Sequence, residues 1–194
     1  MVVDSTGVKV YGEGEWKVRQ HGVDKRRTWR KLHLGVNEAT GEIVAAVASS
    51  NNVSDDEVFG DILDGIEAEI EQVSGDGAYD KRKCYDEIET RGAKATIPPR
   101  KDAVKWQEDA TRKEHPRTQA LERIESVGRQ RWKQESGYHR RSLAETTMFR
   151  FKTIFGGMLR RRRFDHQAVE LFLKCAALNR MIQLGKPDSY KVEN

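Results

Sequence analysis

The sequence predicts an α/β protein in which helices cover a mixed β-sheet. Three segments rich in β-branched residues open the chain, and short strands then alternate with amphipathic helices. A meander followed by alternating helices and strands is typical of one sheet with helices packed on it. The 194 residues are enough for one domain with a substantial core, although hydrophobic residues make up only 37% of the chain.

The individual elements follow from local signals. Residues 1–16 are interpreted as a strand and a hairpin, divided at Ser5-Thr6-Gly7. Turn residues bound most later elements, and Ser54 with Glu57 forms a capping box at the start of the first helix. The further elements expected are strands at 28–36, 42–49, 73–79 and 95–97, and helices from residue 54, over 81–91, over 138–152 and over about 165–184.

We expect one domain over residues 1–184. Within it, residues 101–135 have poor apolar periodicity and many charges, so they are predicted to be an inserted or flexible segment. The tail at 185–194 is predicted to be disordered. The chain has no apolar run of membrane-spanning length and no signal peptide, so a cytoplasmic protein without membrane contact is expected.

Charge is distributed unevenly along the chain. Residues 1–99 carry 13 Lys and Arg against 19 Asp and Glu, whereas residues 100–163 carry 18 against 8. A basic half beside an acidic half indicates a polyanion held near carboxylates. Carboxylates so close to phosphates usually have metal ions between them and the phosphates.

One helical stretch, from Tyr138 to Lys152, contains neither Pro nor Gly. At about 100° per residue, Tyr138, Arg141, Glu145 and Lys152 share one narrow stripe, and apolar residues lie opposite. Taken alone, the stripe is also consistent with a solvated face in which Arg141 and Glu145 form an ion pair worth roughly a few tenths of a kcal/mol.

Three acidic residues are candidates for a metal site. Asp4 follows two apolar strand residues, Asp76 lies between two glycines, and Glu145 is on the helix just described. Asp4 and Asp76 also suit ordinary turns. Carboxylates from two strands and a helix fit two Mg²⁺ ions, which can activate water or a 3′-hydroxyl for in-line displacement at phosphorus.

These residues carry a family resemblance. The stripe matches the signature Y-(2)-R-(3)-E-(6)-K without a gap, and Val-Asp-Ser-Thr-Gly surrounds Asp4 while Gly-Asp-Gly-Ala-Tyr-Asp surrounds Asp76. With these three motifs the chain resembles the DDE transposases of bacterial insertion sequences. The resemblance implies a ribonuclease-H-like fold, a mixed sheet flanked by helices. It also implies divalent-metal-dependent DNA strand cleavage and strand transfer at the ends of a mobile element.

By this resemblance Asp4, Asp76 and Glu145 would be catalytic and would bind two Mg²⁺ ions, for which Mn²⁺ can substitute. Tyr138, Arg141 and Lys152 would contact DNA phosphates, and Arg141 could equally orient Glu145. The implied partners are transposon-end DNA and target DNA. A second copy of the chain, or an upstream transposase fragment, would complete the assembly.

A second basic segment surrounds Trp29. Its cations are predicted to bind DNA because an aromatic residue lies among them and the strand is expected beside that of Asp4. They are Arg26, Arg27, Arg30 and Lys31. The run Arg160–Arg163 is interpreted instead as a solvated charge run, and Trp106 and Trp132 as packing residues.

Members of the resembling family carry a full strand before the first Asp and an upstream region that recognises terminal repeats. Here only Met1-Val2-Val3 precede Asp4. The chain is therefore expected to be an N-terminally truncated catalytic portion that does not recognise repeats alone. Two alternatives stay open at this point: an inactive DNA-binding remnant, and a structure-specific nuclease.

Overall fold

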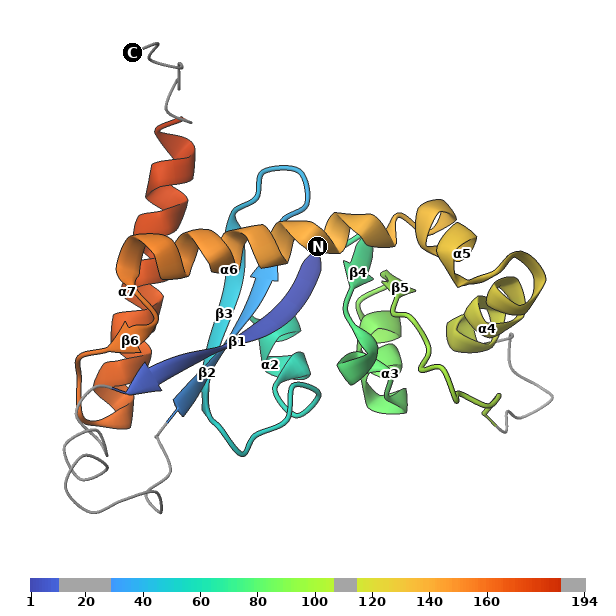
Figure 1. Ribbon diagram of the computed structural model, residues 1–194, viewed down its shortest axis with the longest axis horizontal. Helices are drawn as coiled ribbons and strands as arrows, with labels where there is room; N and C mark the ends of the chain where they lie inside the picture. Colours follow the sequence, from blue (N-terminus) through green and yellow to red (C-terminus); the bar gives the residue numbers. More distant parts are fainter. Residues whose placement is uncertain (11–28, 107–114, 186–194) are drawn as a thin grey trace, which may run out of the picture.

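A computed structural model describes residues 1–10, 29–106 and 115–185. Within these residues a mixed sheet of six strands is flanked by six α-helices (Figure 1). This architecture confirms the predicted α/β class and is consistent with a ribonuclease-H-like fold. The expectations for Arg26, Arg27 and residues 186–194 lie outside the described residues.

The elements have the following bounds. The strands are β1 (Val2–Val10), β2 (Trp29–Val36), β3 (Ile43–Ser50), β4 (Gln72–Ser74), β5 (Lys94–Thr96) and β6 (Met158–Leu159). The helices are α2 (Phe59–Asp64), α3 (Arg82–Thr90), α4 (Pro116–Val127), α5 (Arg129–Glu135), α6 (Ser142–Phe155) and α7 (Phe164–Gln183). Two 3₁₀ turns are η1 (Gly77–Tyr79) and η2 (Tyr138–Arg141).

Strand β1 lies at the centre of the sheet, whose order is β3-β2-β1-β4-β5. It pairs antiparallel with β2, and β2 pairs antiparallel with β3, as the sequence predicted. On its other side β1 pairs in parallel with β4 and, near its end, with the short strand β6. The sequence did not reveal β6, because two paired residues leave no periodic pattern.

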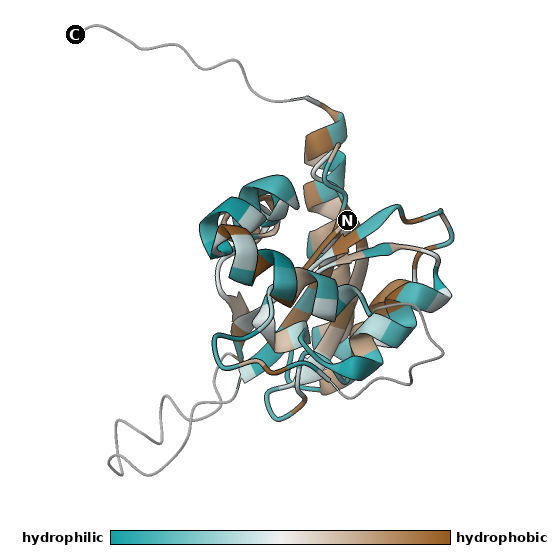
Figure 2. Ribbon diagram, turned by 90° about the vertical axis from the view of Figure 1, so that its right-hand side faces the viewer, coloured by the Kyte–Doolittle hydropathy of each residue, from teal (hydrophilic) through white to brown (hydrophobic). Residues whose placement is uncertain are grey.

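Alternate residues of β1 enter two separate hydrophobic clusters. Val2 lies in a cluster with side chains of α6 and α7, including Phe151 and Leu171. Val3 lies in the other cluster, with side chains of α2 and α3. The sheet is therefore covered on both faces, as period-two alternation requires of a central strand. Figure 1 shows α6 crossing the sheet, and Figure 2 shows hydrophilic residues over the outer helix surfaces.

The predicted division of the first strand at Ser5-Thr6-Gly7 is wrong. Strand β1 continues through these residues, because each pairs with a residue of β2. Gly7 lies under the Trp29 ring, where an added Cβ would be 3.4 Å from the nearest ring atom. An added Cβ would thus make ordinary van der Waals contact with the ring, and Gly7 is a strand residue rather than part of a turn. Residues 11–16 lie outside the described part of the chain.

The first helix is shorter than predicted. The Ser54 backbone N donates to Glu57 Oε1 at 2.8 Å, which is one half of a capping box, and the Ser54 hydroxyl donates to the same oxygen at 2.6 Å. Helix α2 nevertheless begins only at Phe59. It ends at Asp64, and Ile66 and Ile70 are buried beyond its end. Their burial explains the misleading pattern: hydrophobic spacing reports which residues face the core, not whether the backbone stays helical.

The segment 101–135, expected to be inserted or flexible, contains the two helices α4 and α5. Their weak apolar pattern is offset by a buried ion pair. Arg117 Nε and Nη2 donate to the two carboxylate oxygens of Asp80 at 2.6 and 3.2 Å. The guanidinium of Arg117 also lies 4.2 Å from the Trp106 ring centroid, so this tryptophan has the expected packing role. Asp80 ends η1, so the pair joins α4 to the turn after β4.

The helix expected over 138–152 begins as a 3₁₀ turn. Residues 138–141 form η2, and the α-helix starts at Ser142. Ala144, Thr147 and Phe151 are buried, as predicted. Ile154 and Met158 would continue the same apolar side by helical spacing, but both are exposed. Ile154 lies in the last turn of α6, and Met158 lies beyond the helix end, in β6. The last helix, α7, matches its predicted range closely.

A polar cluster is buried on the face of the sheet covered by α2. His33 Nε2 lies 2.8 Å from Ser49 Oγ, and Nδ1 lies 3.5 Å from Asp55 Oδ1. Burial lowers the pKa of His33 to about 4, although Asp55 acts in the opposite direction. The imidazole is therefore neutral at pH 7.

The buried ion pair predicts a large stability effect. Replacing Arg117 by Met leaves the Asp80 carboxylate buried without its cation, which we expect to lower the free energy of unfolding by about 3–5 kcal/mol. Arg123→Met removes an exposed cation that pairs with Glu135 and should cost at most about 1 kcal/mol. Chemical denaturation measures both. Equal losses would contradict a special role for Arg117.

A second prediction concerns pH. Between pH 6.5 and about 4 an unfolded histidine binds a proton that folded His33 does not, so stability should fall as the pH is lowered through this window. A shift of this size corresponds to about 3 kcal/mol. Urea unfolding of the wild type and His33→Gln at both ends of the window isolates the effect, because the carboxylates titrate in both proteins. Identical pH dependence in the two proteins would contradict it.

Candidate active site

Parallel strand pairing brings the first two acidic residues together. Val2 of β1 lies opposite Ser74 of β4. Asp4 follows two residues later within β1, and Asp76 lies two residues beyond Ser74, the last residue of β4, where the backbone is still extended. A two-residue step along an extended chain returns a side chain to the same side. The register therefore directs both carboxylates to one side of the sheet, at the carboxyl end of β4. Burial is the main cause that raises the pKa of Asp4, and the negative charge of Asp76 acts in the same direction.

Asp76 is held by the turn that follows β4. One carboxylate oxygen accepts a hydrogen bond from the Ala78 backbone N at 2.8 Å, so Asp76 caps η1. A Cβ built on Gly75 would lie 2.8 Å from the Tyr79 ring and 3.2 Å from Val3, so no larger residue fits there. Gly77 has ordinary clearance. Of the two glycines that flank Asp76, only Gly75 is in a close approach.

Arg141 joins the third acidic residue to the first. Its Nη1 donates to Glu145 Oε1 at 3.0 Å, and its Nη2 donates to Asp4 Oδ2 at 3.1 Å. The side chain of Asp4 is 15% exposed and that of Glu145 57% exposed, so the strand residue is held while the helix residue faces solvent. A single guanidinium thus bridges carboxylates 141 positions apart in the sequence.

The charges of the site influence one another. Burial raises the pKa of Asp4, and the negative charges of Asp76 and Glu145 act in the same direction. The Ser5 backbone N–H and the Arg141 guanidinium oppose this rise. For Arg141 itself, burial acts to lower the pKa, but Asp4, Tyr138 and Glu145 outweigh it and keep the group cationic. The site is therefore a cluster of negative charge with one structural cation.

Two residues of the stripe flank this cluster. Tyr138 is half-buried on η2, with its ring centroid 6.1 Å from that of Trp132, which is itself packed in the structure as expected. Lys152 lies two helical turns beyond Glu145 and is exposed. Glu145, Arg141 and Tyr138 therefore follow one another along the α6–η2 segment, with Lys152 further along the same helix.

Of the cations around Trp29, the structure describes Arg30 and Lys31. Arg30 Nε donates to Gln167 of α7 at 2.7 Å, and its guanidinium lies 5.4 Å from the Phe164 ring centroid. Lys31 Nζ donates to Val53 O at 2.8 Å and to Asp55 at 3.2 Å. Because neighbouring strand residues point to opposite faces, the two cations engage different sides of the sheet.

Sequence reasoning missed the pair that supports Asp76. Asp80 is part of the Gly-Asp-Gly-Ala-Tyr-Asp motif, but no role was assigned to it. Besides Arg117, it accepts hydrogen bonds from the Arg100 backbone N at 3.2 Å and from the Tyr85 hydroxyl at 3.4 Å. A signal was present, since Asp80 lies four residues after Asp76 in a short turn. Its partner Arg117, 37 residues further along the chain, belongs to no motif that the sequence reveals.

The donor chemistry of the cluster fits a hard divalent cation. Three carboxylates supply the oxygen ligands that Mg²⁺ prefers. Burial raises the pKa of Asp4, as do the negative charges of Asp76 and Glu145, and a bound cation would favour the ionised form. In the arrangement seen, no group of three His, Cys, Asp or Glu in the described ranges is close enough to hold a metal ion. Arg141 occupies the position between Asp4 and Glu145, so metal binding requires the exposed Glu145 side chain and Arg141 to move.

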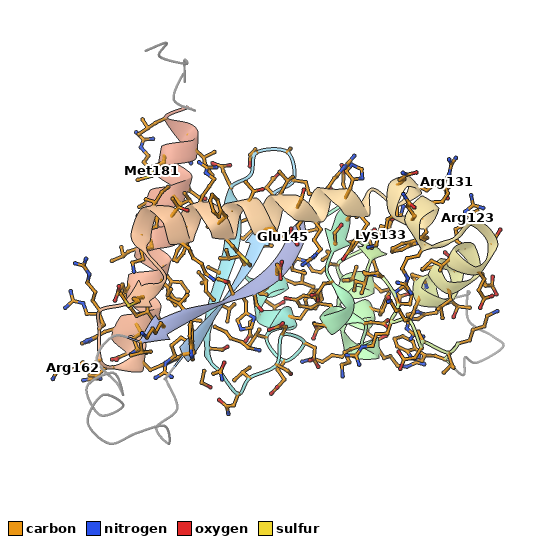
Figure 3. All side chains as sticks on the ribbon, in the orientation of Figure 1. Arg123, Arg131, Lys133, Glu145, Arg162 and Met181 are labelled. Carbon is orange, nitrogen blue, oxygen red and sulfur yellow. The ribbon has the colours of Figure 1, made fainter. Side chains whose placement is uncertain are left out.

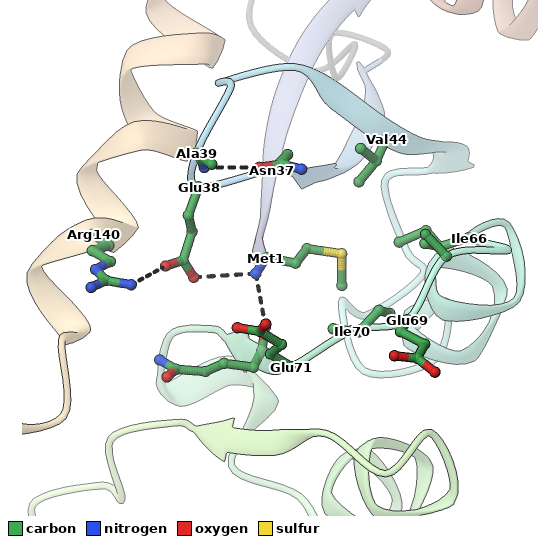
Figure 4. A pocket seen from close by; sticks show the side chains of 12 residues that line it. Met1, Asn37, Glu38, Ala39, Val44, Ile66, Glu69, Ile70, Glu71 and Arg140 are labelled. Atoms are coloured by element: carbon green, nitrogen blue, oxygen red, sulfur yellow. Dashed lines mark hydrogen bonds and ion pairs between the residues drawn. The ribbon is translucent and has the colours of Figure 1, made fainter.

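A pocket lies near the carboxylate cluster but does not include it. A cavity of about 580 Å³ lies beside the amino end of β1, and its lining includes Glu38, Ile66, Ile70 and Arg140 (Figure 4). Arg140 Nη1 donates to Glu38 at 3.3 Å, which ties η2 to the turn between β2 and β3. None of the three acidic residues lines this cavity. Its polar contacts position η2 rather than form part of the carboxylate cluster.

The fold defines the protein as an α/β protein with a mixed sheet, and the family match below adds that it is a nucleic-acid-processing enzyme. The sequence matches the transposase DDE domain family over residues 1–180. The chain therefore belongs to this family, whose members generally use divalent metals and act on DNA. No solved structure matches the chain. In the described part of the chain, no helix is both long enough and apolar enough to span a membrane.

Removing the bridging cation should alter the titration of Asp4. In Arg141→Gln the pKa of Asp4 is expected to rise further, because the guanidinium that favours its charged form is gone. A carboxyl-carbon NMR titration measures this. Lys152→Gln, which removes an exposed cation from the same helix, should leave Asp4 unchanged. The same Asp4 pKa in wild type and Arg141→Gln would refute the bridge.

Proposed function

We propose that this chain is the catalytic domain of a transposase of the Y-R-E-K branch found in bacterial insertion sequences. It performs metal-dependent strand cleavage and strand transfer at the ends of a mobile element. The observation that carries the proposal is the register of β1 with β4, which directs Asp4 and Asp76 to one side of the sheet. Arg141 of η2 links Asp4 to the third acidic residue, Glu145.

Asp4, Asp76 and Glu145 are the residues that would hold two Mg²⁺ or Mn²⁺ ions. When bound, such ions lower the pKa of a coordinated water or 3′-hydroxyl and stabilise the leaving oxygen at phosphorus. The buried Asp4 and the turn-held Asp76 provide a fixed half of the site. Glu145, on the solvent-facing side of α6, provides the adjustable half.

The cations of the stripe act on the substrate. Arg141 neutralises the cluster in free protein, and a DNA phosphate offers the same guanidinium a competing bidentate partner. Its transfer from carboxylates to phosphate would leave Asp4 and Glu145 available as ligands. Tyr138 and Lys152 border the same helix face and would contact neighbouring phosphates.

The partners follow from the reaction. Both transposon-end DNA and target DNA must reach the carboxylates, and the solvent-exposed side chain of Glu145 is accessible to them. Joining two ends requires two such sites, so a homodimer, or a complex with an upstream transposase fragment, would be the working assembly. In a bacterial cell this places the protein in the cytoplasm, associated with the nucleoid through DNA.

Single substitutions of the acidic residues test the proposal. Asp76→Asn and Glu145→Gln should each abolish Mg²⁺- or Mn²⁺-dependent cleavage and strand transfer on labelled DNA carrying the element's ends, while DNA binding persists. Glu125→Gln, which changes an exposed acid on α4, should leave the reaction intact. If the unmutated chain binds DNA but never cuts it with either metal, the catalytic role fails and a DNA-binding remnant is the better description. Cleavage without strand transfer would instead indicate a nuclease.

A further inference from the structure

The active-site segment continues onto a second surface, on α5. Lys133 Nζ lies 5.2 Å from the centroid of the Tyr138 ring, and Tyr138 is three residues before Arg141. Trp132, the residue next to Lys133, packs beside the same ring. The position of α5 relative to the carboxylate cluster is therefore set by direct side-chain contact.

Two arginines extend this surface towards Asp76. Arg129 precedes Lys133 by four residues, so both lie on one side of α5. Arg129 Nη1 donates to Pro99 O at 2.7 Å, and Nη2 lies 3.4 Å from Arg100 O. Arg100 Nε lies 3.4 Å from Gly77 O, one residue after Asp76. We call Arg100, Arg129 and Lys133 the α5 cation track.

The charges of the α5 cation track are not neutralised. Within the described residues, no carboxylate pairs with any of these three side chains, whose contacts are to backbone carbonyls and an aromatic ring. The other side of the helical pair differs. Arg123 and Arg131 both donate to Glu135, at 2.9–3.0 Å. In Figure 3, Lys133 lies between α5 and Glu145, whereas Arg123 and Arg131 lie beyond it.

We propose that the α5 cation track binds successive phosphates of the DNA strand that passes Asp76, beyond the part of the DNA held at the carboxylates. This inference rests on the proposed function. A carbonyl contact orients a guanidinium without cancelling its charge, and a lysine over an exposed aromatic face is held by only about 0.5–1 kcal/mol. The track is therefore preoriented and free to bind an anion. Its position assigns the helical segment 116–135 a role in substrate binding.

The chain offers a matched control for a test. Arg129→Gln with Lys133→Gln removes two cations from the track. Arg123→Gln with Arg131→Gln removes two cations from the neutralised side of the same helices. Binding of a fluorescently labelled duplex by the full chain is measured by anisotropy over a series of salt concentrations. Thermal unfolding of each variant reports on folding.

For the track variant we expect roughly tenfold weaker binding, and a log–log salt slope shallower by about 2, since each lost phosphate contact contributes about 0.9. The control pair should bind like the wild type. Lys133→Gln alone leaves the Arg129 carbonyl contacts in place and should reduce the slope by about 1, which keeps the test decisive if the double variant is unstable.

Two results would contradict this inference and leave the proposed function unaffected. One is wild-type binding and slope in the track variants, and the other is an equal loss in track and control variants, which would show a response to net charge only. In either case metal-dependent cleavage by the wild-type chain would leave the proposed function standing. If the wild-type chain bound no DNA at all, both the inference and the proposed function would fail.

Discussion

The site depends on the parallel pairing of β1 with β4. These strands are 70 residues apart, and a single register, Val2 opposite Ser74, aligns Asp4 with Asp76. A slip of one residue would turn one carboxylate to the opposite face, because side chains alternate along a strand. The hydrophobic clusters on both faces oppose such a slip, because it would remove Val2 and Val3 from the clusters in which each is packed. Core packing and site geometry are therefore maintained by the same register.

Burial and mutual repulsion of the carboxylates lower the stability of the folded protein, and the positive charge of Arg141 offsets part of this loss. Burial and two like charges disfavour ionised Asp4, and the guanidinium restores part of the balance. A metal ion or a phosphate would compete for the same partners. In the free protein the Arg141 guanidinium thus lies between Asp4 and Glu145, where the proposed function needs a metal ion. This explains how an exposed Glu145 can belong to a structured site, because its partner Arg141, not burial, holds it near Asp4.

The α4–α5 pair shows how a segment with little apolar pattern becomes ordered. The bidentate Asp80–Arg117 pair and the contacts of Arg117 with Trp106 replace a hydrophobic stripe. Removing either partner alone would leave the other charge buried and uncompensated, so the two residues depend on each other. It joins α4 to the turn of Asp76, while Lys133 meets Tyr138 from α5. Two polar contacts thereby set the side of these helices that faces the site.

The sequence by itself determined the α/β class, the meander, the last helix and the motifs around the three acids, because these depend on local periodicity and short-range spacing. It also placed Arg141 and Glu145 on one helical turn. Only the tertiary structure decided that β1 is continuous, that α2 is short and that residues 116–135 are helical. It alone paired Arg141 with Asp4 and Arg117 with Asp80. Those contacts join residues 137 and 37 positions apart, and no local pattern in a chain encodes which distant charge will meet another once both leave water.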